Sequence, residues 1–517
     1  MLKNSRAVKF LVPFTLAGVL LAGCAGGGTD TSDDSSDSQP PSEPTGTLRI
    51  NWGSVPSSWA PGARTEPGMM YIPYESLVQL GENYEILPNL ATEWVEDETS
   101  LTLTLRDDVT FHDGTPFNAE AVKTNIEYVR DNPGSYSGPL QVVESVEVVD
   151  EYTVQINFSA PAPSFLTMLT RNNVLIASPA AIEDGSIVEN PVGTGPWAYD
   201  AGSSVEGTRW MFTLNEDYWG EQVYFENVEA FGIEDDTAAV GALLNDEIAV
   251  TDVENDQQPR IEGVANIDSY EYPAVRNNVV FFDRAPGGVF GDANVRKAMC
   301  YAMDVAGLTE VPNQSLIDSP QQHFLEGDPG YNPDIAGYPP NLEEAQAVLD
   351  GATVEATFPA AVFLKGQLEY LADNMNQLDG VEVSVQDLAI PDFQSTWNSG
   401  QYALGVGQNA EMTPFDWYQA WFAEDSGQNP SGYESPELKA AADAAIAAGS
   451  SEEADALWQE VMKVIIDDEA LACAFAVGGQ TIGWDTNDVA GVQPPPSLPY
   501  SVNVVDYRSI YPVTSEE

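Results

Sequence analysis

The chain has 517 residues, with 19 basic and 81 acidic side chains and a formal net charge of −62 at pH 7. This charge excludes nucleic acid as a partner, because phosphate recognition needs a basic footprint. A chain of this length exceeds what one hydrophobic core usually serves, so two or three domains are expected.

The first 23 residues have the pattern of an export signal. Lys3, Arg6 and Lys9 are followed by an apolar stretch from residue 10 to residue 21 and then by small residues. The apolar stretch is well short of the roughly 20 residues that span a bilayer, which argues against a transmembrane anchor.

The tetrapeptide Leu21-Ala22-Gly23-Cys24 resembles a bacterial lipobox. The resemblance implies that Cys24 carries a lipid and becomes the mature N-terminus; the alternative is an ordinary cleavage site with an unrelated cysteine. Residues 24–46 are mostly Gly, Ser, Thr, Asp and Pro, which predicts a flexible acidic tether between the lipid and the body.

Removing residues 1–23, which hold three basic and no acidic residues, leaves 16 basic against 81 acidic residues and a net charge of −65. Adaptation to salt is the favoured explanation, because salt screens the repulsion between like charges. The alternative is an acidic cleft for cationic solutes.

Alternating apolar residues predict strands in the first third of the body. The pattern occurs at residues 47–52 and again at Leu101, Leu103 and Leu105. Residues 143–149 and 153–158 flank Asp150-Glu151 and predict a hairpin.

Helical periodicity occurs at several later places. Asn118 can cap a helix whose apolar face continues to Val129, and Ser435-Pro436 has the pattern of an N-cap followed by proline at the first helical position. Further helices are predicted around residues 295–302 and 457–465. Helices mixed with strands indicate an α/β or α+β body.

Two cysteines remain after Cys24, namely Cys300 and Cys473, each in an apolar, helix-like context. Export would permit a disulfide, but two buried free thiols are an equal alternative, because spacing alone does not bring two residues together.

Several motifs in one order resemble the family 5 extracellular solute-binding proteins, the peptide and nickel class of importer receptors. They are Tyr74-Glu75-Ser76-Leu77-Val78, LRDDVTFHDGTPFNAEAV at 105–122, Pro191-Val192-Gly193-Thr194-Gly195-Pro196-Trp197, Asn215 with Tyr218-Trp219, Val295-Arg296-Lys297-Ala298 with Tyr301-Ala302-Met303-Asp304, and Gly432-Tyr433 with Ser435-Pro436-Glu437-Leu438. The resemblance covers nearly the whole mature chain.

These motifs also have a local structural interpretation. His112-Asp113-Gly114 suits a tight turn in which Gly114 adopts a positive φ. Gly193 and Gly195 permit a close approach of two backbones. We therefore interpret His112 as part of a turn, with a ligand or a catalytic base as the weaker alternative.

The resemblance implies a periplasmic-binding-protein-like α/β fold of type II, the three-lobed cluster C type, with a ligand cleft between two large lobes. Lobe I would combine residues 48–66, 190–275 and 478–517. Residues 67–189 would form a smaller inserted lobe II, and residues 276–477 would form lobe III. Chain crossings near 276 and 478 would act as the hinge.

In such receptors the solute is held by strand ends and loops at the interlobe cleft. One predicted contact region follows the first strand, and the other follows a strand at 402–404 and includes Gly407. The candidate ligand residues are Trp52, Gly53, Ser54, Tyr71, Gln408, Asn409 and Trp417.

One departure from the family pattern concerns the solute's charge. Peptide-binding members commonly have an Asp in the second region, which pairs with the peptide's free amino group, whereas this sequence aligns Asn409 there. An amide supplies no net charge. Glu411 or Asp416 could substitute, and a sugar, a modified peptide or another amine stays open as the solute.

No metal, cofactor or catalytic residue is expected. His112 and His323 are the only histidines, so a nitrogen-rich nickel site is disfavoured. The sequence contains no G-x-S-x-G, no H-E-x-x-H and no Gly-Lys dipeptide. An extracellular hydrolase is the alternative of a different class, and a sensory solute receptor without transport is the other.

The sequence therefore predicts the substrate-binding lipoprotein of an ABC importer and not an enzyme. Its expected partners are a small solute, of the oligopeptide or a related type, and the permease and ATPase subunits. We expect a monomer held by its N-terminal lipid at the outer face of the cell membrane, extracellular or periplasmic.

Overall fold

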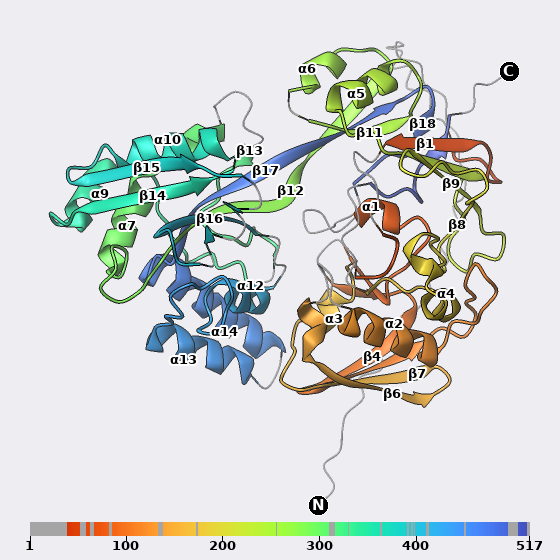
Figure 1. Cartoon of the computed structure of the whole chain (residues 1–517), viewed down its shortest axis with the longest axis horizontal. Coiled ribbons are helices and arrows are strands. Elements are labelled where there is room, and N and C mark those ends of the chain that lie inside the picture. The colour runs from red at the N-terminus through yellow and green to blue at the C-terminus, as the bar shows by residue number, and fades with distance from the viewer. Residues whose placement is uncertain are drawn as a thin grey trace, which may run out of the picture. The chain divides into compact units, whose positions relative to one another are not determined.

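A long antiparallel strand pair organises the computed structural model. The structure describes residues 39–51, 58–62, 67–81, 85–132, 138–171, 174–254, 256–309, 316–328, 330–361, 364–389, 392–393, 396–397, 399–409, 413–448, 451–494 and 505–513, without the side chains of 273–277, 317, 408–409 and 451–452. The pair, β12 (Ile267–Phe282) with β17 (Ala472–Asp485), extends from Ile267 opposite Asp485 to Phe281 opposite Ala472, with two register shifts between these ends. Figure 1 shows the two strands side by side.

This pair belongs to a nine-stranded mixed sheet. Its path runs β16-β12-β17-β11-β1-β10-β9-β8, and β13 also pairs with β17. β1 is parallel to β10 and β11, and the other pairs are antiparallel. The remaining bounds are β1 (Thr47–Asn51), β8 (Trp197–Tyr199), β9 (Arg209–Leu214), β10 (Asn227–Phe231), β11 (Val250–Val253), β13 (Leu316–Asp318) and β16 (Leu404–Asn409).

A second sheet of four antiparallel strands has the order β4-β5-β7-β6. The residues of β5 that alternate in the sequence, Leu101, Leu103 and Leu105, are buried as predicted. The predicted hairpin is confirmed as β6 paired with β7. The strands are β4 (Ala91–Asp97), β5 (Ser100–Leu105), β6 (Val143–Asp150) and β7 (Thr153–Phe158).

The predicted helix caps are confirmed. The side chain of Asn118 accepts a hydrogen bond from the backbone N–H of Ala121, and α2 (Ala119–Asp131) follows. The hydroxyl of Ser435 likewise accepts from Leu438 at the start of α13 (Pro436–Ile446). In both places a side-chain oxygen satisfies a backbone donor that the helix leaves unpaired.

The other elements include a parallel two-stranded sheet, β14-β15, and two short antiparallel pairs, β2-β3 and β18-β19. The helix predicted around 457–465 is α14, continued by a π-helical turn at Val464–Asp468. Bounds are α1 (Pro67–Met70), α3 (Phe165–Met168), α4 (Pro179–Glu183), α5 (Asp236–Leu244), α6 (Gln258–Ile261), α7 (Ala293–Ala302), α8 (Val305–Thr309), α9 (Leu342–Leu349), α10 (Lys365–Met375), α12 (Pro414–Trp421), α14 (Ser451–Lys463), β2 (Val78–Leu80), β3 (Ile86–Pro88), β14 (Val354–Ala360), β15 (Val381–Asp387), β18 (Val489–Ala490) and β19 (Tyr511–Pro512), with 3₁₀ turns at Gly138–Val142 and Ser186–Val188.

One prediction about local structure was wrong. Gly407 and the two residues after it were expected in a loop, but they form the end of strand β16, opposite residues 277–279 of β12. Gly407 is required for packing, since a Cβ there would lie 2.3 Å from the ring of Trp421 and 2.7 Å from that of Phe281. Those two rings stack on each other at 4.1 Å. Glycine here serves close packing in a strand instead of a turn.

The buried apolar side chains gather in separate clusters. One lies wholly within residues 77–176, around the four-stranded sheet and α2. Two others lie within residues 279–476. A fourth combines residues 48–74, 175–250 and 482–510 with Tyr272. Apolar burial, the main favourable contribution to folding, is therefore divided among several cores.

Cys300 and Cys473 form a disulfide with their Cα atoms 5.8 Å apart. The bond joins α7 to β17 across 173 positions of sequence, and both residues are buried in the same core. It resolves the two alternatives that the sequence left open. The helix-like context expected for Cys473 was wrong, because this residue lies in strand β17. A cross-link that closes so long a loop restricts the unfolded chain and thereby stabilises the folded one.

We expect the C300S/C473S double variant to unfold with a free energy about 2–5 kcal/mol below that of the unmodified chain. Thermal unfolding followed by circular dichroism measures the change. Dithiothreitol should lower the melting temperature of the unmodified chain towards that of the variant and leave the variant unchanged. Equal melting temperatures without reductant would contradict a stabilising role.

Candidate functional site

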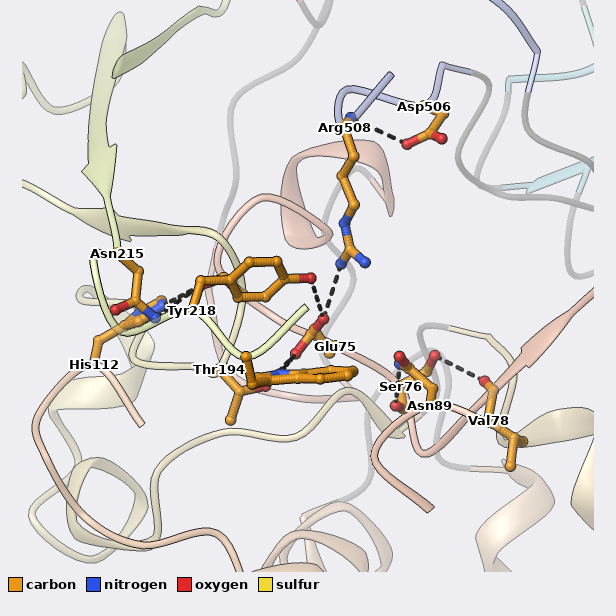
Figure 2. Close-up of polar contacts among 12 residues, drawn as sticks. Glu75, Ser76, Val78, Asn89, His112, Thr194, Asn215, Tyr218, Asp506 and Arg508 are labelled. Atoms are coloured by element: carbon orange, nitrogen blue, oxygen red, sulfur yellow. Dashed lines mark hydrogen bonds and ion pairs between the residues drawn. The ribbon is translucent and has the colours of Figure 1, made fainter. Parts of the chain in front are cut away.

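The carboxylate of Glu75 is fully buried and accepts hydrogen bonds from four side chains. The donors are Thr194, Tyr218, Trp219 and Arg508, and we call these five residues the four-donor cluster. One oxygen accepts from the hydroxyl of Tyr218 at 3.0 Å and from the guanidinium of Arg508 at 3.1 Å. The other accepts from the hydroxyl of Thr194 at 2.9 Å and the indole N–H of Trp219 at 2.6 Å. Figure 2 shows the side chains of Thr194, Tyr218 and Arg508 directed at the carboxylate.

Burial raises the pKa of Glu75 above its ordinary value, and the positive charge of Arg508 is the largest opposing effect, followed by the three neutral donors. A carboxylate offers about four acceptor positions, and here four donors occupy them. The cluster has no acceptor left for a solute or a metal. We therefore infer that the four-donor cluster has a structural role: it joins segments that are distant in sequence, from residue 75 to residue 508.

The turn around Gly114 and the glycines of the P-V-G-T-G-P-W motif meet beside this cluster. Gly114 has φ of +81°, as predicted. A Cβ on Gly193 would lie 2.0 Å from the carbonyl oxygen of Pro73, so the predicted close backbone approach is confirmed. The Nε2 atom of His112 lies 2.9 Å from the carbonyl oxygen of Gly195, and burial lowers the pKa of its imidazole. The ring of His112 thus contacts the backbone of Gly195, which agrees with its interpretation as part of a turn.

Several predicted ligand residues cannot be placed. Trp52, Gly53 and Ser54 lie outside the described residues, and so does Glu411. For Gln408 and Asn409 the structure gives the backbone only, opposite Asn278 and Asn277 of β12. Their side chains stay without a structural test.

Tyr71 and Trp417 have very different surroundings. Tyr71 is half-buried, and burial raises the pKa of its phenol while Arg171 and Arg508 lower it. Trp417 is fully buried in an aromatic core, where its ring stacks on His323 at 4.7 Å. Its indole N–H has no hydrogen-bond partner in the described part of the chain. Trp417 thus contributes core packing here.

Asp416 lies one residue before Trp417, in the first turn of α12. One carboxylate oxygen accepts from the hydroxyl of Ser164 at 2.6 Å, and the other accepts from that of Thr413 at 2.8 Å. Burial raises the pKa of Asp416, while these two hydroxyls and the positive charge of Arg171 lower it. Because Arg171 acts on both Tyr71 and Asp416, two regions about 345 positions apart in sequence share one electrostatic environment.

Sequence reasoning assigned no role to Glu75, Ser164, Arg171 or Arg508. Glu75 gave one usable signal, since it stands in the otherwise weakly polar run Tyr74 to Val78. The partners of these residues lie far away in sequence, and no local pattern identifies them. The candidate solute site is therefore the neighbourhood of Tyr71, Arg171 and Asp416 together with the end of β16.

Comparison with known proteins gives a coherent result. The family described as bacterial extracellular solute-binding proteins, family 5, matches residues 85–431. The probable D,D-dipeptide-binding periplasmic protein DdpA of Escherichia coli K12 is 24% identical over 437 residues, 78% of this chain and 83% of that protein. The nickel-binding periplasmic protein of the same organism is 29% identical over 218 residues, 40% of each chain.

Among solved structures, HbpA2 from Haemophilus parasuis superposes with a TM-score of 0.79 at 20% sequence identity. The superposition covers 90% of this chain and all of that one. It shows a shared fold of the periplasmic-binding-protein type.

We expect R508M to lower the free energy of unfolding by about 3–5 kcal/mol, because Glu75 would stay buried without its cation. The matched control is K439M, which breaks the exposed pair with Asp443 and should leave the free energy of unfolding nearly unchanged, because solvent screens exposed ion pairs. Denaturant unfolding followed by tryptophan fluorescence compares the two. Equal losses would show that the four-donor cluster does not need its charge.

Proposed function

Because this chain belongs to the bacterial extracellular solute-binding proteins of family 5, we propose that it captures a small peptide-like solute and passes it to an ABC permease. The receptor role follows from the family, which consists of binding proteins and not of enzymes. The match over residues 85–431 is the observation that carries it. The solute class, the absence of catalysis, the monomeric state and the lipid anchor are our proposals.

We propose the three lobes as stated above, with lobe II at 67–189 and lobe III at 276–477. Three hydrophobic clusters support this division, because one lies within lobe II and two lie within lobe III. In the fourth, buried apolar residues at 69–74 and 175–187, predicted for lobe II, pack with residues of lobe I, which favours narrower bounds for lobe II. The paired β12 and β17 cross between lobe I and lobe III, and the register shifts between Pro273 and Asn277 favour bending there. Solute would be held between these lobes.

A peptide-like solute is supported by the relative that matches most of this chain, a probable D,D-dipeptide-binding protein. Nickel is not proposed, although a nickel-binding relative matches part of the chain. Of the two histidines, His112 contacts the backbone of Gly195, and His323 is fully buried against Trp417. We propose contacts to the solute from Trp52, Gly53, Ser54, Tyr71, Gln408 and Asn409; Trp417, also predicted, is fully buried and is left out.

Lipid anchoring through Cys24 is the proposed link to the membrane. Several acyl chains on one cysteine would hold the protein far better than a single chain. Within the described residues, no helix combines the length and the apolar content that crossing a bilayer requires.

Binding is tested on the full chain in detergent with D-alanyl-D-alanine and L-alanyl-L-alanine. A dipeptide that binds only the folded protein should stabilise it by about 2.7 kcal/mol at 100 times its dissociation constant, seen as a concentration-dependent rise in melting temperature. Native mass spectrometry should recover the dipeptide unchanged. Hydrolysed dipeptide would refute the non-enzymatic role, and no response to either would refute this solute class. Loss of uptake on deletion separates transport from sensing.

For the anchor, C24A should move the protein from the membrane fraction to the soluble fraction, because the lipid has no other attachment point. Immunoblotting of the separated fractions measures this. C300S/C473S is the matched cysteine control and should stay with the membranes. Retention of C24A would contradict lipidation.

A further inference from the structure

The hydrogen bond between Ser164 and Asp416 joins two parts of the chain that pack in different cores. Ser164 immediately precedes α3, whose Phe165, Leu166 and Met168 belong to the core of the four-stranded sheet. Asp416 lies in α12, whose buried side chains belong to a core within residues 279–475. The two oxygens are 2.6 Å apart, although the residues are 252 positions apart.

The two sides of this bond are also connected through the long strands. The four-donor cluster fixes the segment at Glu75, beside the four-stranded sheet, to the C-terminal segment at Arg508. From there the chain reaches the core of α12 through the paired β12 and β17. The Ser164–Asp416 bond is therefore a second, direct link between the two parts. It would have to break if the strands bent and the two parts separated.

Among the contacts of the described residues, the hydroxyl of Ser164 donates to Asp416 and does not cap a helix. Ser164 occupies the N-cap position of α3, yet its side chain makes no capping hydrogen bond. Capping of α12 is done by Thr413, whose hydroxyl accepts from the backbone N–H of Asp416. Neither helix needs the Ser164 hydroxyl for its own terminus.

The surroundings of the Asp416 carboxylate also suit a contact that can break and re-form. A buried carboxylate is costly unless hydrogen bonds and opposite charge compensate it. Ser164, Thr413 and Arg171 supply that compensation for Asp416. On separation, water would replace the Ser164 hydroxyl, so the bond can break and re-form at modest cost.

We propose that Ser164 and Asp416 form a latch that sets how much of the protein is in the solute-holding conformation. Asp416 is then a positioning residue and not the anchor for a solute's ammonium group: it holds Ser164 through one oxygen and Thr413 through the other, and the positive charge of Arg171 disfavours a second cation beside it. The latch would strengthen binding of every solute alike, since apparent affinity scales with the fraction of binding-competent protein. This effect on affinity rests on the proposed solute-binding function.

The latch is tested without any solute. The full chain, purified in detergent, carries spin-labelled p-acetylphenylalanine in place of the exposed Val149 of β6 and the exposed Lys439 of α13. Electron–electron double resonance then gives the distances between the labels. S164A should lower the ratio of short to long separations about tenfold or more, the loss expected for a hydrogen bond to a charged group.

D416A should have a similar effect, and S164A/D416A should add little to it, because both remove one interaction. The control is S159A, which removes an exposed hydroxyl that donates to Val142 within the same part of the chain, and it should leave the distances unchanged. An unchanged distribution in folded S164A, or additive effects of the two substitutions, would overturn the proposal.

A binding measurement distinguishes two roles of Asp416, part of the latch or anchor for the solute's amino group. D416A should weaken L-alanyl-L-alanine and N-acetyl-L-alanyl-L-alanine by the same factor in isothermal calorimetry. A loss confined to the peptide with the free amine would overturn the proposal. If D-alanyl-D-alanine also fails to bind the unmodified chain, the proposed solute class fails, while the distance measurement still decides on the latch.

Discussion

The pairing of β12 with β17 is the constraint on which the rest of the structure depends. Both strands are long. At one end β17 also pairs with β11, and at the other end β12 pairs with β16 while the disulfide ties β17 to α7. A hydrogen-bonded strand pair resists stretching and twisting but bends where its ladder is irregular. The register shifts near Pro273 and Asn278 supply that irregularity. Separate cores can therefore stay intact while the chain between them bends.

Two buried carboxylates illustrate opposite uses of the same chemistry. Glu75 has four donors, one of them cationic, and is completely enclosed, so breaking the cluster would leave an uncompensated charge. Asp416 has two hydroxyl donors, one of them from a part of the chain that packs in a different core, and it lies in the field of Arg171. The first arrangement is suited to a permanent joint, and the second to a reversible contact. Counting buried acids alone would not distinguish them.

What the sequence could predict was determined by distance along the chain. Caps at Asn118 and Ser435 were predictable because donor and acceptor lie within three residues. Gly407 was misassigned because a glycine in an edge strand has the same local signature as one in a loop. Arg508, the charged partner of Glu75, is 433 positions away, and the disulfide partner of Cys300 is 173 positions away. Such pairings depend on how the cores pack, which no local pattern encodes.

The position of Arg508 also bears on how the chain is made. A protein emerges N-terminus first, and its domains generally fold as units in that order. Glu75 is synthesised early, whereas its counter-charge follows 433 positions later. Until Arg508 appears, the four-donor cluster lacks its charged donor. The segment around Arg508 thus completes the cluster, so a product that stopped before residue 506 would keep nearly all of its apolar cores and still be a target for proteolysis.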